Sequence, residues 1–446
     1  MEKNLTQGGI FKNLVLFSLP FLLSYFLQTL YGLADLFIVG QFCGVENITA
    51  VSSGSQIMHM LTVMIVGLAM GSSVSIGKAV GAEDKNLRNL IIGNTVIIFI
   101  CVSFVLAILL LILNSFIIQL ISVPQEAVGG TYKYLAVCFA GIPFIVAYNI
   151  ISSILRGMGD SKTPMYFIAV ACVCNIILDF VFVGFLKLEA LGAALGTIIS
   201  QGISVIISLV FLIKKKIIDG FNKSHFKIKK NVVFAIFKIG IPVSAQDGFI
   251  QISFIIITVF ANKRGLNDAA AVGIVEKIIG ILFLIPSTLL SSVSTLCAQN
   301  IGAGKEERAK KTLFCSCLIA IICGLFFAVL FQFIAEFAVS LFTKNSEVIK
   351  LGSQYLKSYV WDCVGGGIHF SFSGYFCACS RSGISFLHNV ISILTARIPL
   401  AYYASVHFKD TLFPMGFAAP TGSFVSVIVC IIAFLILNRK SKILVE

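Results

Sequence analysis

Two carboxyl side chains stand out in the first half of the chain because each lies inside a long apolar stretch. Asp35 and Asp179 have no lysine or arginine in the interior of their own stretch or of a neighbouring one. An unpaired carboxylate in a low-dielectric interior is costly, so such groups take up protons, bind a metal cation or reach water. A carboxylate pair that exchanges protons or sodium is what ion-coupled transport requires.

Further oxygen-bearing side chains accompany the pair. Asn175 lies four residues before Asp179, so both side chains share one helix face. Carboxylate, amide and hydroxyl oxygens together suit a small hard cation, and the same group can hold protons. The alternative interpretation is polar contact between helices, worth about 0.6–2 kcal/mol each. The predicted Na⁺ or proton site comprises Asp35, Asn175, Asp179 and Thr197, with Gln28 and Tyr31 on the helix stripe that leads to Asp35.

The elements that position these groups must be membrane helices. The chain has 446 residues, of which 58% are hydrophobic and 12% charged, and its mean hydropathy is +1.00. Soluble domains are nearer half apolar and a quarter charged. This composition excludes a disordered chain, a coiled coil, a collagen, a small disulfide scaffold and a large water-soluble enzyme.

A bilayer core of about 30 Å requires about 20 apolar residues per helix. The sequence predicts twelve such helices, at approximately 14–40, 48–77, 90–122, 131–157, 164–186, 190–213, 233–261, 269–298, 311–342, 351–378, 383–407 and 413–437.

Lysine and arginine gather in the loops on the side of both termini, which predicts that both termini are cytoplasmic. The net charge of +13 is therefore interpreted as membrane anchoring. Because no basic face is continuous, we expect no nucleic-acid partner.

The chain also repeats itself. Val80-Gly81-Ala82 returns as Ile301-Gly302-Ala303, 221 residues later, and Pro20 corresponds to Pro242 one residue off that register. This predicts an N-lobe at 1–213, a basic cytoplasmic linker at 214–231 and a C-lobe at 232–446. Six helices per lobe leave both lobes in one orientation, related by a pseudo-two-fold axis along the membrane normal. The expected fold class is therefore an all-α integral membrane protein of the alternating-access type.

The second lobe does not repeat the carboxyl pair, since Ile257 and Leu400 stand at the equivalent positions. Two interpretations of its own polar residues stay open: an ion-pair network, or a second cation or substrate site. Its charged side chains in apolar stretches are Asp247, Glu276, Lys277, Asp362 and Arg397, and Gln246 and Gln251 add polar groups in either case.

Other residues predict no enzyme chemistry. No H-E-x-x-H, G-x-S-x-G or P-loop signature occurs, and His59, His369 and His388 are interpreted as isolated packing residues. Without a P-loop, energy must come from an ion gradient, so we expect no cofactor beyond the coupling ion. Pro20 can kink its helix, and a bend there could couple protonation of Asp35 to a change in cavity shape.

At this point the chain resembles the MATE (multidrug and toxic compound extrusion) transporters over nearly its whole length. The order and spacing of the motifs carry the resemblance. In chain order they are Pro20, Tyr31-Gly32-Leu33-Ala34-Asp35 with Val39-Gly40, Val80-Gly81-Ala82, Leu155-Arg156-Gly157-Met158-Gly159-Asp160, Asn175 with Asp179, Leu191-Gly192-Ala193-Ala194 with Thr197, Gln299-Asn300-Ile301-Gly302-Ala303 and Arg397-Ile398-Pro399.

The resemblance implies a V-shaped pair of six-helix lobes and antiport of drugs against sodium or protons. It implies an N-lobe cation site at Asp35, Asn175, Asp179 and Thr197, with Gln28, Tyr31 and Pro20 around it. Some relatives place a cation site in the C-lobe instead, on the helices that here carry Asp247 and Asp362. The chain looks closest to bacterial drug-efflux members.

The resulting functional hypothesis is a cation-coupled multidrug efflux antiporter in the bacterial cytoplasmic membrane. Its expected partners are small organic cations or amphipathic drugs and the lipid bilayer, and it is expected to act as a monomer. The alternatives are a lipid-linked precursor flippase, which would need a more basic central cavity, and a metabolite exporter of the same superfamily.

Overall fold

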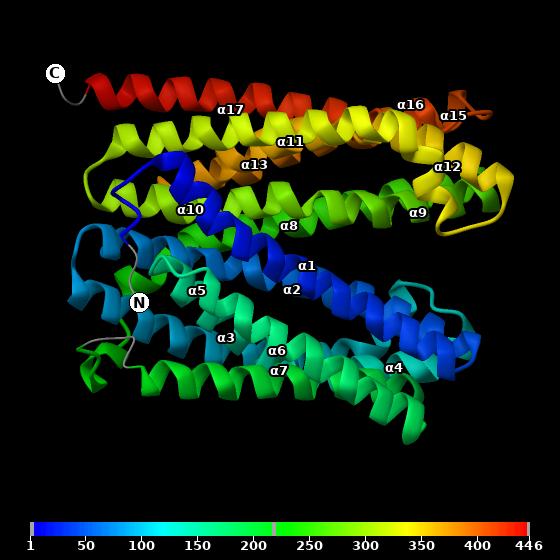
Figure 1. Ribbon diagram of the computed structural model, residues 1–446, viewed down its shortest axis with the longest axis horizontal. Helices are drawn as coiled ribbons and strands as arrows, with labels where there is room; N and C mark the ends of the chain where they lie inside the picture. The colour runs from blue at the N-terminus through cyan, green and yellow to red at the C-terminus, as the bar shows by residue number, and fades with distance from the viewer. Residues whose placement is uncertain (1–3, 216–219, 444–446) are drawn as a thin grey trace. The chain divides into compact units, whose positions relative to one another are not determined.

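The structure, a computed structural model, describes residues 4–215 and 220–443. Within these residues all regular secondary structure is helical (Figure 1). The first six membrane segments comprise α1 (Ile10–Phe42), α2 (Val45–Gly81), α3 (Lys85–Leu120), α4 (Gln125–Ala140) with α5 (Ile142–Gly157), α6 (Lys162–Asp179) with the π-helix η1 (Phe180–Phe185), and α7 (Glu189–Lys214).

A short 3₁₀ turn, η2 (Lys223–Phe226), precedes the second set. Its six segments comprise α8 (Lys230–Arg264), α9 (Leu266–Leu282) with α10 (Leu284–Gly302), α11 (Glu306–Ser340), α12 (Ser346–Tyr359) with α13 (Asp362–Ala378), α14 (Ser382–Ser392) with the π-helix η3 (Ile393–Arg397) and α15 (Ile398–His407), and α16 (Phe413–Gly416) with α17 (Ala418–Ile443).

Ten of these segments are long and apolar enough to cross a membrane, and the bent pair α4–α5 makes an eleventh. The twelfth is α12 with α13, which have 14 and 17 residues and so are each shorter than a full span. The predicted fold class, twelve helical segments in two sets of six, is confirmed.

The fourth predicted span is not straight, because α4 and α5 meet at an angle of 48°. Gly141 lies at the break, and Pro143 occupies the first turn of α5, where the missing N–H costs least. Gly141 also lets α7 approach, since a Cβ there would lie 2.4 Å from Ile198 Cδ1.

The chain divides into two compact units. The first contains Leu16–Gly240, and the second contains Thr6–Val15 together with the chain from Ile241 onward. This boundary lies within α8, two residues before Pro242. The predicted division at a linker, 214–231, stays a prediction, and residues 216–219 of that linker lie outside the described residues.

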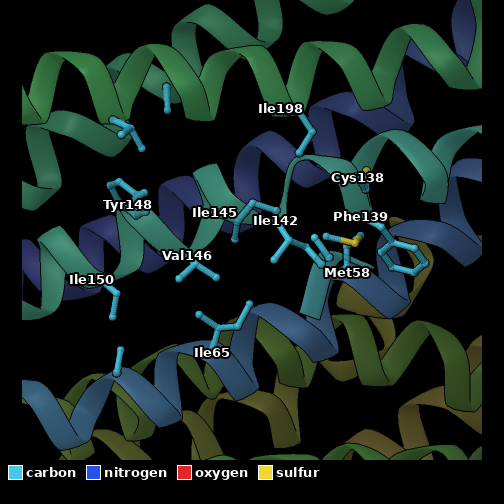
Figure 2. Close-up of a cluster of buried hydrophobic side chains, with 14 of the residues drawn as sticks. Met58, Ile65, Cys138, Phe139, Ile142, Ile145, Val146, Tyr148, Ile150 and Ile198 are labelled. Carbon is cyan, nitrogen blue, oxygen red and sulfur yellow. The ribbon is translucent and has the colours of Figure 1, made fainter. Parts of the chain in front are cut away.

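Close packing stabilises the first unit. Figure 2 shows side chains of α2, α4, α5 and α7 meeting there, among them Met58, Phe139, Ile145 and Ile198. Lipid tails are as apolar as these side chains, so helix association in a bilayer depends on van der Waals contact and interhelical hydrogen bonds. Ser153 Oγ of α5 donates such a bond to Ala69 O of α2 at 2.6 Å.

Glycine permits the tightest approach in the first unit. A Cβ at Gly71 of α2 would lie 2.0 Å from Ile236 O of α8, and a Cβ at Gly240 would lie 2.3 Å from Leu68 O. The obstructing atoms belong to helix backbone, which cannot rotate aside.

We therefore expect Gly71→Ala to destabilise the protein by about 1–3 kcal/mol, the usual cost of overpacking. The melting temperature in detergent measures this loss. Gly32→Ala is the matched control, because a Cβ at Gly32 would meet no atom within 4 Å. Equal melting temperatures for the two variants would contradict the prediction.

Candidate cation site

The structure brings together the four residues of the predicted N-lobe site from three helices. Thr197 Oγ1 of α7 donates a hydrogen bond to Asp35 Oδ2 of α1 at 3.1 Å. Asp35 also lies within interaction range of Asn175 and Asp179, both on α6. Asp35, Asn175 and Asp179 are 4%, 1% and 0% exposed, respectively.

Most of the polar atoms at this site have no protein partner. Asp35 Oδ1, both carboxyl oxygens of Asp179 and both amide atoms of Asn175 are buried without a hydrogen bond in the structure. Buried polar groups are nearly always hydrogen-bonded, and exceptions point to an absent ligand or ion. Because three of the unpartnered atoms are carboxyl oxygens, the arrangement can accept a cation or protons.

Gly196, which the sequence interpretation did not single out, shapes this site. A Cβ at Gly196 of α7 would lie 2.1 Å from Asp179 Oδ1. The carboxyl group therefore occupies the space that any side chain at this position would fill. The resemblance to MATE transporters assigned Thr197 to the site, but no sequence pattern indicated that its neighbour had to be glycine.

A local change of helix geometry follows Asp179. It is the last residue of α6, and the next six residues form the π-helix η1. A Cβ at Gly192 of α7 would lie 3.0 Å from the backbone carbon of Phe182, so α7 packs closely on this wider turn. Single π turns interrupt α-helices most often at functional sites.

The supporting residues lie around the carboxyl pair. Tyr31 lies beside Asp35 and Gln201, and the Oε1 atom of Gln201 is buried without a partner. Gln28 lies beside Tyr148, whose hydroxyl donates to Pro164 O at 3.3 Å. Gln201, another residue that the sequence interpretation missed, extends the polar region from Thr197 by one turn of α7.

Pro20 lies buried in α1, and its carbonyl accepts a hydrogen bond from Ser24 Oγ at 2.9 Å. The guanidinium carbon of Arg156, in the last turn of α5, lies 4.5 Å from the centre of the Phe21 ring. The structure thus adds a cation–π contact next to the proline of α1.

The second unit has a separate polar pocket. It has a volume of about 30 Å³, and its polar lining residues are Asp362, His369, Asn389, Ser392, Arg397 and Ser423. Both carboxyl oxygens of Asp362 and the Nε atom of Arg397 are buried without a hydrogen bond in the structure. The pocket is large enough for water, which would satisfy such groups.

The ion-pair interpretation of the C-lobe charges stays a prediction, since Asp362 and Glu276 both lie within electrostatic range of Arg397. In the described ranges, no ion pair joins any two of the five charged side chains. Arg397 instead donates to the Tyr359 hydroxyl at 2.6 Å and stacks on Phe254 at 4.6 Å. Glu276 Oε1 accepts a bond from Thr258 Oγ1 at 3.0 Å. Hydroxyl and aromatic groups are therefore the direct contacts of Arg397 and Glu276, while both carboxyl oxygens of Asp362 have no hydrogen bond in the structure.

The remaining predicted C-lobe residues, Gln246 and Asp247, are adjacent on α8. Gln246 is fully buried, and both atoms of its amide lack a hydrogen-bond partner in the structure. Neither residue lines the pocket around Asp362.

Two histidines that the sequence interpretation treated as isolated are neighbours. The rings of His369 and His388 lie 5.4 Å apart, edge to face. His388 is hydrogen-bonded through its two ring nitrogens to Ser373 Oγ at 2.9 Å and Ser426 Oγ at 3.2 Å. Serines from α13 and α17 hold this pair, a tertiary arrangement that sequence spacing could not show.

A comparison with known protein families gives a match in both halves of the chain. The family model described as MatE matches residues 20–181 and again residues 242–403. The two matches begin 222 residues apart, which agrees with the internal repeat found in the sequence.

Curated relatives match over most of their length. The chain is 28% identical over 434 residues to "Probable multidrug resistance protein YoeA" of Bacillus subtilis (strain 168), covering 95% of this chain and 93% of that protein. It is 25% identical over 371 residues to "Multidrug export protein MepA" of Staphylococcus haemolyticus (strain JCSC1435), covering 82% and 81%.

Solved structures share the fold. One is described as "Crystal structure of MATE in complex with MaL6"; it is 21% identical, has a TM-score of 0.90 and covers 98% of this chain and 97% of that chain. A second, a MOP superfamily transporter from Pyrococcus furiosus, is also 21% identical with a TM-score of 0.90, covering 99% and 98%.

Proposed function

The chain belongs to the MatE family, and from this premise we propose that it is a cation-coupled antiporter that exports cationic or amphipathic organic compounds. The observation that carries the proposal is the group of buried, unpartnered oxygens at Asp35, Asn175 and Asp179. Relatives named for multidrug resistance and multidrug export support the substrate class. The match to the MatE family supports a role in membrane transport rather than in enzyme catalysis.

The coupling ion is sodium or a proton. Carboxyl and amide oxygens are ligands that Na⁺ accepts, and the same carboxyls can be protonated. In either case the ion neutralises charge that the protein leaves uncompensated. Thr197 keeps Asp35 oriented through its 3.1 Å hydrogen bond, so the ion finds the carboxyl pair already assembled.

The transport cycle follows from reciprocal coupling. The ion enters from outside and binds at Asp35 and Asp179, and the loaded site favours release of the drug. Loss of the ion to the cytoplasm restores two unpaired carboxyls and favours drug loading from that side. If the ion weakens drug binding by a given factor, the drug weakens ion binding by the same factor.

The excess of lysine and arginine in alternate loops supports a multi-pass arrangement in the bacterial cytoplasmic membrane with both termini inside. A single chain holds both six-helix sets, which supports function as a monomer.

Purified protein in liposomes tests the proposal. Efflux of a fluorescent lipophilic cation is followed under an imposed sodium gradient and then under a proton gradient. We expect one gradient to drive efflux, and we expect Asp35→Asn and Asp179→Asn each to reduce it to the rate of protein-free liposomes. Glu126→Gln, at an exposed acid in the first turn of α4, is the matched control.

Two other results would contradict the proposal, and a third would show that the control variant is unsuitable. If neither gradient moves the dye, a flippase or a metabolite exporter fits better. If the Asn variants transport normally while Asp362→Asn does not, the coupling site lies in the C-lobe. Loss of efflux in Glu126→Gln would show that the assay does not distinguish the site from the rest of the protein.

A further inference from the structure

A segment after the first six helices is pinned along the first turns of α3. We call residues 220–230 the strap. Asn94 of α3 donates from Nδ2 to Lys227 O at 3.1 Å and accepts at Oδ1 from Lys229 N at 2.8 Å. One amide side chain therefore bonds to both main-chain groups that flank Ile228. This fixes the backbone and leaves the Ile228 side chain 63% exposed.

A second contact holds the beginning of the strap. His225 is buried, and its Nε2 atom lies 3.0 Å from Asn86 Oδ1 of α3. Asn222 and His225 also form a capping box around η2. Gly93 permits the close approach, because a Cβ there would lie 2.2 Å from His225 O. The strap is thus docked onto α3 from its inner face.

The outer face of the strap combines positive charge with apolar groups. Lys223, Lys227, Lys229 and Lys230 are exposed, and no ion pair engages them in the described part of the chain. Phe226 is 40% exposed, whereas Phe221 is half-buried and stacks on His225 at 5.5 Å. Exposure is therefore not a general property of the apolar residues in this segment, since Phe221 packs inward on His225 whereas Phe226 is exposed.

The location of the strap indicates which part of the membrane its outer face contacts. It lies along the first turns of α3, where the polar first turn gives way to the apolar span. Phe226 and Ile228, interspersed with four lysines, form the pattern of a segment that lies in the headgroup region. Each lysine near an anionic membrane surface contributes about 1 kcal/mol, or about fivefold in affinity.

We propose that the outer face of the strap is a docking surface for anionic phospholipids. The lysine ammonium groups bind lipid phosphates, and Phe226 and Ile228 enter the boundary between headgroups and acyl chains. Asn94 holds the segment in the conformation that presents both. This interaction is independent of the coupling ion and of the transported compound.

Fluorescence quenching in nanodiscs tests the proposal with the full chain. The chain has one tryptophan, so Ile228→Trp combined with Trp361→Phe places a single indole on the strap. Acyl chains brominated on phosphatidylglycerol or on phosphatidylcholine then report which lipid lies beside it. We expect phosphatidylglycerol to quench at least about fivefold more effectively per lipid, the effect of one lysine.

Matched charge removal identifies the cause. Lys227→Gln with Lys229→Gln, added to the reporter variant, should lower the preference at least about fivefold, the effect of one lysine. The strap should keep its conformation, because the Asn94 bonds use main-chain atoms. Lys344→Gln with Lys350→Gln removes the same charge from the loop before α12 and from α12 itself, and should leave the preference intact. Melting temperatures equal to that of the reporter variant confirm that each variant is folded.

Several results would overturn the proposal. Equal quenching by the two lipids would show apolar contact without headgroup selection. Absence of quenching would place the strap in water, available to a soluble partner. Inorganic phosphate can be added to nanodiscs that lack phosphatidylglycerol. If it changed the emission of the strap indole as phosphatidylglycerol does, the site would bind a free anion rather than a lipid surface.

Discussion

Gly196→Ala is expected to lose gradient-driven efflux almost completely while the protein still folds and inserts. The added Cβ would lie 2.1 Å from Asp179 Oδ1, well inside the closest approach of real atoms. The backbone of α7 yields less easily than a side chain, because Gly196 lies inside a continuous helix, Glu189–Lys214. The Asp179 carboxyl group is therefore expected to rotate away and to leave the candidate cation site.

This prediction separates position from charge, since both carboxyls remain in the Gly196→Ala variant. Efflux in liposomes and cation-induced thermal stabilisation should both fall to the values of Asp179→Asn. Gly202→Ala, two turns further along α7, is the matched control, because its Cβ would come only within 3.8 Å of Phe144. If Gly196→Ala kept full gradient-driven efflux, transport would not require the Asp179 carboxyl group in its observed position.

The sequence allowed prediction of the fold because the helices are defined by long apolar runs. The length of these runs and the repeated motifs were enough for twelve segments in two sets of six. The bend at Gly141 was not predicted, because an apolar run looks the same whether or not the helix breaks within it. Pro143, one residue into α5, was the available signal.

The grouping of the N-lobe candidates could be predicted from their types, because an acidic group in an apolar run is rare and costly. Thr197 also lies where expected, bonded to Asp35. Gly196 and Gln201 were missed for a different reason. A glycine or an amide in a membrane helix is common, and only the packing of α6 on α7 shows which one touches the site.

The C-lobe shows the limit of charge counting. Three acids and two bases suggested pairing, but the count did not indicate that Arg397 would contact the Tyr359 hydroxyl and the Phe254 ring directly. Which side chains meet between helices depends on the rotation of each helix about its axis. The number of charged residues in the sequence gives no information about that rotation. The histidine pair, His369 with His388, was missed for the same reason, since its members lie on different helices.

Asp179→Asn is expected to make the protein inactive and more resistant to heat. Both Asp179 oxygens are buried without a partner, and an ionised carboxyl there is an uncompensated charge. Asparagine has nearly the same shape without that charge. Without sodium and at a pH high enough to ionise both carboxyls, we expect the variant to be more stable than the wild type by about 1–3 kcal/mol, the penalty of one unsatisfied buried group.

Addition of the coupling cation should reverse the order of stability. A ligand that binds only the folded state at 100 times its dissociation constant stabilises it by about 2.7 kcal/mol. The wild type should gain this stability, whether from sodium at constant pH or from a lower pH without sodium, and the ion that acts is the coupling ion. Asp179→Asn should not respond, and Glu126→Gln should respond as the wild type does.

The two measurements, thermal stability and efflux, together test whether the carboxyl is kept for function. If Asp179→Asn melted below the wild type in the absence of the cation, Asp179 would have a partner that stabilises its charge. The absence of hydrogen bonds to the Asp179 carboxyl oxygens would then no longer be evidence for a bound ion. A variant that is more stable but inactive means that the protein retains a destabilising group because transport requires a site that is satisfied only when the ion is bound.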